Sequence, residues 1–446
     1  MRIPETPPDH RPIMMKLMKK EDSVKLLFES PLTDEKGRYL HWEELKRRKP
    51  PEGLTPEGHW AAMKFARMGK SQTTPFLDKD GDKFSFCETD AIRRLAHFID
   101  SEARGSIALP SGQIQRGAGD RYLVRSLIEE PFSSSVLEGA ATTREIAKKL
   151  ISDNETPRTK DERMVLNNFF AMQLIKENCD APLTPDFVLK LHKTITQGTL
   201  SDPSKAGAFR SDADDIAITD DKQILFTPPP ALDLPERLKK LCDFANEPID
   251  AKHFIHPILR AIILHFMLGY DHPFVDGNGR TARALFYWSV LRSNYWLLEY
   301  VSISRVIKKA PTQYGMAYLH SETDGADLTY FILHQLGIVK TAIKELQTYL
   351  AKKAEELDQL EALISKKREG RVLNHRQIQI LNEAIKNPKS TFTIAEHQKF
   401  HRVSYLTARA DLERLFDERL LKKKKKAQTS IYSLSQKYRE ILWAAR

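Results

Sequence analysis

Two helix-length apolar segments mark the middle of the chain, one from Phe254 to Tyr270 and one from Ala284 to Leu291. They enclose a polar turn, His272 to Arg283, which holds a base, a carboxylate, two glycines and two arginines within twelve residues. A turn fixed between two buried helices is held rigidly, and preorganised chemistry requires such rigid placement. The pattern therefore predicts a functional site at this turn.

Helical signals precede the turn. Residues 131–139 predict a short helix, with a proline near its start and Gly139 ending it. Thr142 and Glu145 fit a capping box that would open the following helix. Residues 160–200 predict two more helices, so this part of the chain is expected to be mainly helical.

One stretch before the turn predicts β-structure. Between Asp214 and Pro230, two short apolar runs flank a polar Asp-Asp-Lys turn. This pattern is typical of a β-hairpin, here ended by prolines. The alternative is a plain connection between helices.

The net charge of +10 at pH 7 belongs to the C-terminal segment. Residues 371–446 hold 17 Lys and Arg against 7 Asp and Glu, so the rest of the chain balances. This segment predicts helices at 376–386, 393–397 and 403–415, then a hairpin at 420–434. A basic excess confined to one segment is a signal at the level of a domain.

Other features of the sequence indicate the cellular compartment in which we expect the protein to work. No uncharged apolar stretch reaches 18 residues, and the N-terminus lacks the apolar region of a signal peptide. The three cysteines, Cys87, Cys179 and Cys242, are odd in number and widely spaced. They favour a reducing cytoplasm over a disulfide framework or a zinc site.

The polar turn has the chemistry of an anion site. Gly277 and Gly279 allow backbone N–H groups to converge on one anion, and the helix that begins near Gly279 adds its positive end. Arg280 and Arg283 are three residues apart, so they share a helix face and can clamp phosphate oxygens.

Two further side chains complete this site. Asp276 is a hard oxygen ligand suited to Mg²⁺, which commonly binds one or two carboxylates together with substrate phosphates. His272 can accept a proton near neutral pH. Together these residues predict a nucleoside triphosphate, held with a metal ion beside a general base.

Two other interpretations are disfavoured. Gly277, Gly279 and Ala282 match a dinucleotide fingerprint, but that fingerprint follows a β-strand and the approach here is helical. A zinc site would need clustered ligands. The candidate histidines span several faces of a helix without a His-Glu-x-x-His pattern; they are His253, His256, His265 and His272.

The turn also resembles, position for position, the signature of the Fic family, His-Pro-Phe-x-Asp/Glu-Gly-Asn-Gly-Arg-x-x-Arg. Fic enzymes mostly transfer AMP from ATP to a protein hydroxyl, so the resemblance implies a protein adenylyltransferase with His272 as its base. Asp276 would hold Mg²⁺ or Mn²⁺. Gly279 favours AMP transfer, because a phosphorylating branch of the family carries lysine there. The resemblance assigns nucleotide binding to Asp276, Gly277, Asn278, Gly279, Arg280, Thr281, Arg283 and Tyr314. Tyr314 stands where the family usually has the first of two tyrosines near adenine, and the second is glycine here.

Two other segments resemble family elements. Ser134-x-x-x-Glu138-Gly139 resembles the inhibitory motif, in which the glutamate pairs with the second arginine, here Arg283. The alternative to an inhibitory role is a helix that simply ends in a surface glutamate. The hairpin resembles the Fic flap, which pairs with the backbone of the target by β-augmentation. Its docking residues would be Ile224, Leu225, Phe226 and Thr227.

The C-terminal segment resembles a winged helix-turn-helix. Its expected recognition helix carries Ser404, Tyr405, Thr407 and Arg409, and its wing carries Lys422, Lys423, Lys424, Lys425 and Lys426. Lysines so placed contact DNA phosphates and give affinity without reading sequence. A solvated charged tail and a winged helix that binds protein stay open.

We therefore expect a mainly α-helical cytoplasmic protein with a Fic-type core, a β-hairpin flap and a C-terminal winged helix-turn-helix. The expected parts are an N-terminal region at 1–118, the core at 119–340, a connecting helix at 341–369 and the basic domain at 370–446. Expected partners are ATP, a target protein with an exposed hydroxyl (the chain itself included) and DNA, with no membrane and a homodimer left open. The alternatives are a nucleotide-sensing DNA-binding regulator and a Fic enzyme that removes AMP.

Overall fold

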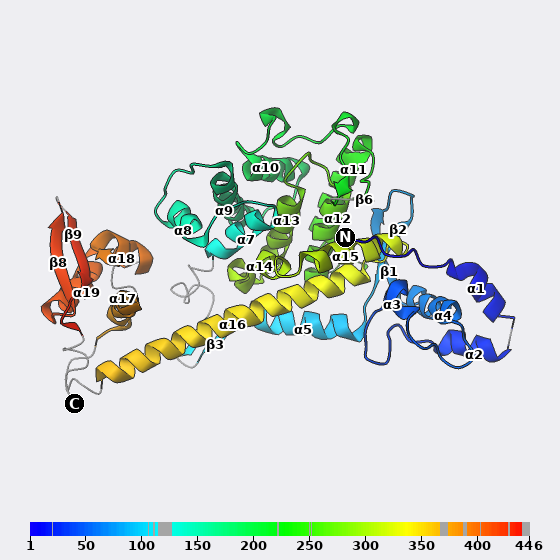
Figure 1. The fold of residues 1–446 in the computed structure, drawn as a ribbon, viewed down its shortest axis with the longest axis horizontal. Coiled ribbons are helices and arrows are strands. Elements are labelled where there is room, and N and C mark those ends of the chain that lie inside the picture. Colours follow the sequence, from blue (N-terminus) through cyan, green and yellow to red (C-terminus); the bar gives the residue numbers. More distant parts are fainter. Residues whose placement is uncertain are drawn as a thin grey trace. The chain divides into compact units, whose positions relative to one another are not determined.

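The computed structural model describes most of the chain, in two compact units. The described residues are 1–19, 21–105, 107–109, 112–114, 127–220, 223–248, 250, 252–365, 373–386, 390–401, 403–426 and 429–438. Unit 1 comprises residues 1–105 and 126–344, and unit 2 comprises residues 106–125 and 345–446. The protein is mainly α-helical, as predicted, with sheets of two or three strands in the described part (Figure 1). None of the described helices combines the length and the apolar character needed to cross a membrane.

The centre of unit 1 is a pair of buried helices, α12 (Pro257–Asp271) and α13 (Asn278–Arg292). The predicted polar turn joins them. Both are buried on nearly all faces because neighbouring helices surround them. The surrounding helices are α9 (Lys160–Asn178), α10 (Pro185–Thr196) and α11 (Leu234–Asn246). The two helices predicted within 160–200 are therefore confirmed.

The predicted inhibitory segment is a helix, α7 (Glu129–Leu137), which begins two residues earlier than expected. Gly139 follows it with φ +91°, the left-handed conformation that ends helices. The next helix is α8 (Arg144–Ser152). Its N-cap is Thr143, whose side chain accepts from the N–H of Ile146, so the capping box expected at Thr142 is wrong by one residue.

The predicted flap is a short antiparallel hairpin of β5 (Ile218–Thr219) and β6 (Ile224–Phe226). Ile218 pairs with Phe226, and Thr219 pairs with Ile224. The residues expected at its tip, 221 and 222, lie outside the described residues.

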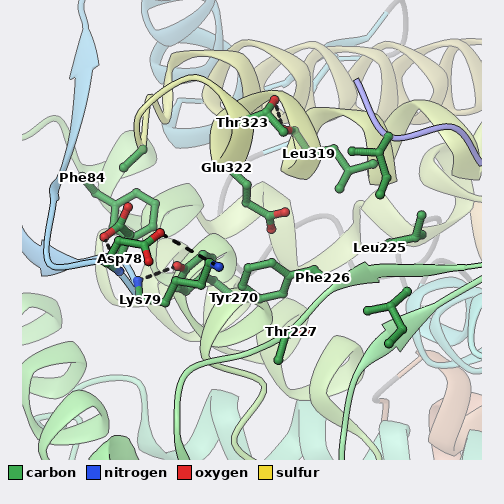
Figure 2. Close-up of a pocket in the computed structure, with 14 residues that line it drawn as sticks. Asp78, Lys79, Phe84, Leu225, Phe226, Thr227, Tyr270, Leu319, Glu322 and Thr323 are labelled. Carbon is green, nitrogen blue, oxygen red and sulfur yellow. Dashed lines mark hydrogen bonds and ion pairs between the residues drawn. The ribbon is translucent and has the colours of Figure 1, made fainter. Parts of the chain in front are cut away.

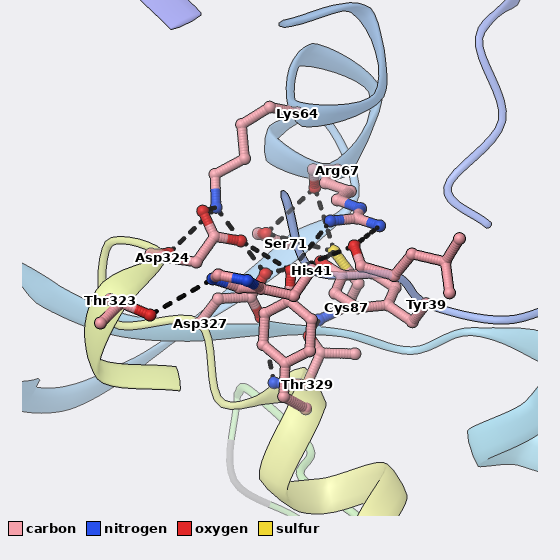
Figure 3. Close-up of polar contacts among 12 residues, drawn as sticks. Tyr39, His41, Lys64, Arg67, Ser71, Cys87, Thr323, Asp324, Asp327 and Thr329 are labelled. Carbon is pink, nitrogen blue, oxygen red and sulfur yellow. Dashed lines mark hydrogen bonds and ion pairs between the residues drawn. The ribbon is translucent and has the colours of Figure 1, made fainter. Parts of the chain in front are cut away.

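The N-terminal residues contribute α1 (His10–Leu17), α2 (Glu21–Glu29), α3 (Trp42–Leu45), α4 (Pro56–Met68), α5 (Asp90–Arg104) and a hairpin of β1 (Ser71–Leu77) and β2 (Lys83–Cys87). A buried polar network ties this region to the segment that follows α15 (Pro311–Thr323) (Figure 3). The Arg67 guanidinium lies 3.7 Å from the centre of the Tyr39 ring and donates to the Tyr330 hydroxyl at 3.1 Å. Tyr39 donates to Asp327 at 2.6 Å, and Lys64 pairs with Asp324 at 2.6 Å. The N-terminal region and the helical core therefore form one compact unit.

The remaining helices of unit 1 include α14 (Ile303–Ile307) and the first part of α16 (Thr329–Ser365). The helix predicted at 341–369 thus begins earlier, at Thr329, and its predicted end lies outside the described residues.

Unit 2 contains α17 (His375–Lys386), β7 (Thr391–Thr393), α18 (Ile394–His401), α19 (Tyr405–Asp417), β8 (Leu421–Lys426) and β9 (Thr429–Leu434). Its sheet has the order β7-β9-β8. The three helices and the hairpin lie near the predicted positions, but α18 ends four residues later than predicted and α19 begins and ends two residues later. The strand β7 was not predicted, and it includes Thr393, which was expected to be helical. A short hairpin of β3 (Ile107–Leu109) and β4 (Gly112–Ile114) also belongs to this unit. The predicted domain boundaries near 118 and 370 lie outside the described residues.

Candidate active site

His272 directly follows α12 and has a left-handed backbone, with φ +45°. Its Nδ1 lies 3.2 Å from the carbonyl oxygen of Gly269. A carbonyl can only accept, so Nδ1 carries the proton and Nε2 is left with a free lone pair. Burial lowers the pKa of His272 below 6.5, which keeps the ring neutral near pH 7. The imidazole is therefore in the form that can accept a proton.

The turn after His272 is closed by Asn278. Its Oδ1 accepts from the N–H of Phe274 at 2.9 Å, and its Nδ2 donates to the carbonyl of Phe274 at 2.8 Å. Gly277 has φ +85°, and a Cβ there would lie 2.7 Å from Cγ2 of Thr196. Only glycine fits this position. Because the Asn278 amide is used within the turn, its contact with an α-phosphate stays a prediction.

The predicted phosphate-binding side chains lie on the first turns of α13. Arg280 is buried, and its Nη2 lies 3.2 Å from Oδ1 of Asp276. The Asp276 side chain is half-exposed. Thr281 donates its hydroxyl to the carbonyl of Gly277 at 2.8 Å, so this side chain supports the turn.

Glu138 lies against the predicted anion site. Its Oε1 accepts from Nη2 of Arg283 at 2.8 Å, and a side chain at Gly279 would collide with its carboxylate. Ser134 Oγ accepts from Nε and Nη2 of the same arginine, at 3.0 and 2.9 Å. The structure thus brings the three predicted groups Ser134, Glu138 and Arg283 together, with a carboxylate beside the start of α13.

The segment that carries Glu138 is anchored by Glu130, which the sequence analysis missed. The buried Glu130 carboxylate accepts from the Ser302 hydroxyl at 2.8 Å and from the N–H and hydroxyl of Ser304 at 3.1 and 2.5 Å. Asn168 also donates to the Ser135 hydroxyl at 2.8 Å. These contacts fix α7 to its neighbours, and so they fix the position of Glu138.

Two further residues, which the sequence analysis also missed, contact the turn from other parts of the chain. His192 stacks on Phe274 with ring centres 3.7 Å apart, and its Nε2 lies 2.8 Å from the carbonyl of Asp276. Burial lowers the pKa of His192 to about 4, so it is a neutral donor there. Arg210 donates from Nε to the carbonyl of His272 at 2.8 Å and from Nη2 to that of Pro229 at 2.6 Å. Arg210 therefore ties the turn to the segment that follows the flap.

Tyr314 lies on α15, with its hydroxyl 2.9 Å from Nε2 of His265. Burial raises the pKa of Tyr314, so the phenol stays protonated. A Cβ at Gly315 would lie 2.7 Å from Cε of Met1, so the Met1 side chain takes the space beside this glycine. The contact of Tyr314 with adenine stays a prediction.

The flap residues differ in exposure. The Ile224 side chain is largely exposed, at 58%, while Phe226 packs on Tyr270 with ring centres 4.8 Å apart. In the described part of the chain β6 pairs only with β5, so its other edge can accept a further strand.

The predicted DNA-binding residues lie on α19 and β8 of unit 2. Ser404 caps α19 by accepting from the N–H of Thr407 at 3.1 Å. Tyr405 and Arg409 are exposed. Lys423 pairs with Glu413 at 2.5 Å and lies over the Tyr432 ring. Three other lysines of β8 are exposed, namely Lys422, Lys424 and Lys425, and the Lys426 side chain lies outside the described residues.

The residues of this turn lie within a segment of the chain that matches a family model. Residues 182–290 match the model of the Fic/DOC family, so the chain contains a Fic domain. It is 25% identical over 205 residues to protein adenylyltransferase Fic of Nematostella vectensis, which covers 44% of each chain. It is 34% identical over 110 residues to protein adenylyltransferase fic-1 of Caenorhabditis elegans, covering 25% of this chain and 20% of that one. The chain thus spans less than half the length of these relatives. A crystal structure of a Fic family protein from Desulfovibrio desulfuricans G20 matches with a TM-score of 0.49 and 21% identity, covering 78% of this chain and 97% of that chain.

Proposed function

We propose that this protein transfers AMP from ATP to a hydroxyl of a target protein. One observation carries the proposal: a single turn joins an imidazole nitrogen with a free lone pair to an anion site at a helix N-terminus. Relatives that are named protein adenylyltransferases support the same activity.

The chemistry follows from the placement of these groups. Nε2 of His272 takes the proton of a Ser, Thr or Tyr hydroxyl as its oxygen attacks the α-phosphorus of ATP. The bond from that phosphorus to the bridging oxygen breaks, and pyrophosphate leaves. Arg280 and Arg283 hold the β- and γ-phosphates and the charge that develops on the leaving group. The N–H groups at the start of α13 face the charge on the α-phosphate.

A divalent metal ion could be bound through Asp276. Within the described ranges, no group of three or more His, Cys, Asp and Glu side chains could hold a metal ion. Asp276 is half-exposed at the phosphate site, which suits Mg²⁺ or Mn²⁺ bound by one carboxylate and substrate phosphates. Such an ion, when bound, neutralises phosphate charge. Asp276 would hold it there.

We further propose that the isolated enzyme is inhibited by Glu138. A carboxylate in contact with Arg283 takes the guanidinium that the γ-phosphate needs. ATP bound beside it would lie askew, and small misplacements of a reacting group cost large factors in rate. The free edge of β6 would receive the backbone of the target as an added strand.

A second proposed function is DNA binding by unit 2. The exposed lysines of β8 and the net charge of +10 in residues 371–446 favour it. The winged-helix assignment stays a prediction. A nucleotide-sensing DNA-binding regulator and a Fic enzyme that removes AMP are alternatives that activity assays separate.

The test is incubation with ATP labelled on the α-phosphate, using wild type, Glu138→Gly and Glu138→Gly with His272→Ala. Mass spectrometry then looks for an added AMP moiety on the protein itself or on a lysate protein. Label with Glu138→Gly that disappears with His272→Ala supports AMP transfer. ATP binding without label in any variant would favour a nucleotide sensor. Loss of AMP from an adenylylated protein, with water as the attacking group and free AMP as the product, would favour a Fic enzyme that removes AMP.

A further inference from the structure

A cavity of about 300 Å³ lies beside the flap and away from the phosphate site. One wall is β6 with Thr227, and the opposite side is the tip of the β1–β2 hairpin (Figure 2). Its floor is aromatic: the rings of Phe84 and Phe226 lie 5.0 and 4.8 Å from that of Tyr270. The space has room for one long side chain.

The hairpin tip that forms one rim is held in place by the helix of the active site. The N–H of Lys79 donates to the Tyr270 hydroxyl at 2.9 Å, and Arg237 bridges Asp271 at 2.7 Å and the carbonyl of Leu77 at 2.8 Å. Tyr270 and Asp271 directly precede His272. The cavity is therefore fixed relative to the proposed base.

Three carboxylates line this cavity, and that of Glu322 points into it (Figure 2). Glu322, from the last turn of α15, extends between the aromatic floor and Leu319 (Figure 2). Among the described residues, no side chain or backbone group hydrogen-bonds or ion-pairs with it. Burial raises the pKa of Glu322 to about 8, and Lys79 opposes that rise only in part. A carboxylate in this environment is stabilised when a cation enters.

The charge of the cavity rim also favours a cationic ligand. Asp78 and Asp80 line the same cavity, against one ammonium, that of Lys79. Lys79 is half-exposed and lies 4.0 Å from Asp80. The aromatic floor suits an aliphatic stem, and the carboxylates suit its cationic end.

We infer that this cavity is a specificity site that takes an arginine or lysine side chain of the target protein. The inference rests on the proposed function, in which the target adds a strand to the free edge of β6. The backbone of that strand would run along β6, and one basic side chain beside the modified hydroxyl would enter the cavity and pair with Glu322. The site would then select target sequences by a basic residue at one fixed position from the acceptor.

A binding experiment tests the cavity without any transfer. N-acetyl-arginine methylamide and its uncharged analogue, N-acetyl-citrulline methylamide, are titrated by NMR into the full chain. The comparison uses wild type, Glu322→Gln and a matched control, Glu236→Gln, an exposed carboxylate on α11. We expect the arginine probe to shift the residues of the cavity and to bind about tenfold more weakly to Glu322→Gln only. Binding should also strengthen from pH 7 to 9 as Glu322 ionises; the other titratable groups facing it are Asp78, Lys79, Asp80 and Tyr270. Equal binding of the two probes to wild type, or an unchanged affinity in Glu322→Gln, overturns the inference.

A transfer experiment then tests specificity. Peptides with one threonine acceptor carry arginine or citrulline at each position in turn, and Glu138→Gly supplies the activity. We expect one position at which arginine lowers KM about tenfold with kcat unchanged, and loss of this preference in Glu138→Gly with Glu322→Gln. Labelled peptides without a basic preference overturn the specificity site and leave AMP transfer standing. If Glu138→Gly labels no peptide and no protein, the proposed function fails, while the probe titration still decides the cavity.

Discussion

Replacing Glu138 by glycine should convert a nearly silent protein into an active one. The structure holds Arg283 from two sides, through Glu138 Oε1 at 2.8 Å and through Ser134 Oγ at 3.0 and 2.9 Å. Glu138→Gly removes only the first of these. Arg283 then keeps its position through Ser134, but its guanidinium becomes available to the γ-phosphate of ATP.

The size of the effect follows from the strength of that contact. A hydrogen bond between charged groups contributes about 1.5–3 kcal/mol, and 1.4 kcal/mol corresponds to a factor of ten. The Arg283 side chain is buried, but that of Glu138 is 27% exposed, so solvent screening favours the lower end of the range. We therefore expect self-labelling to rise at least about tenfold.

The assay measures incorporation of label from α-labelled ATP over time, with Glu138→Gln and Arg283→Ala as companions. Glutamine keeps the shape of the side chain without its charge, so it should activate partly. Arg283→Ala also breaks the pair, yet it should stay inactive because the phosphate clamp is gone. Equal labelling by wild type and Glu138→Gly would refute the inhibitory role, and strong labelling by Arg283→Ala would refute the clamp.

Three further predictions concern the proposed base, the lysines of β8 and the core of unit 2. His272→Ala should lower the rate of AMP transfer by about 10²–10⁴-fold and leave the affinity for ATP unchanged. Because the pKa of His272 lies below 6.5, the pH–rate profile of the activated enzyme should be flat near pH 7 and should fall only in acid. Neutralising Lys422–Lys426 should flatten the salt dependence of DNA binding, by about one unit of slope for each DNA phosphate that the variant no longer binds. No DNA affinity of the full chain even at low salt would contradict the DNA-binding role. Asp411→Asn should destabilise unit 2 by about 3 kcal/mol in denaturant unfolding, because the buried carboxylate pairs with Arg376 at 2.5 Å. The pKa of Asp411 is lowered from 3.8, so its contribution is present above that pH and is lost as the pH falls through the folded value.

The parts of the site that could be predicted from the sequence are determined by residues that lie close together in the chain. Gly277 and Asn278 shape the turn from within it, and the two apolar helices on either side are visible as patterns. Gly139 ends its helix by a local backbone preference. Because these rules act over a few residues, the predictions that used them were wrong only by small shifts, such as an N-cap at Thr143 instead of Thr142.

The parts that the sequence did not predict depend on distant partners. Glu130 meets Ser302 across 172 residues, and Arg210 reaches the carbonyl of His272 across 62. Neither side chain belongs to a local pattern that distinguishes it from a surface charge. The strand β7 was missed for the same reason, since three residues become a strand only when β9 lies beside them. The cavity at Glu322 combines residues from five separate parts of the chain, which no periodicity brings together.

The backbone of His272 has a consequence for stability. A residue with a side chain in the left-handed conformation is strained by about 1–2 kcal/mol relative to glycine, which commonly fills the position after a helix. Folding alone would favour glycine here, but glycine carries no imidazole. A screen that selected variants only for thermal stability would therefore drift toward His272→Gly and would discard the proposed base.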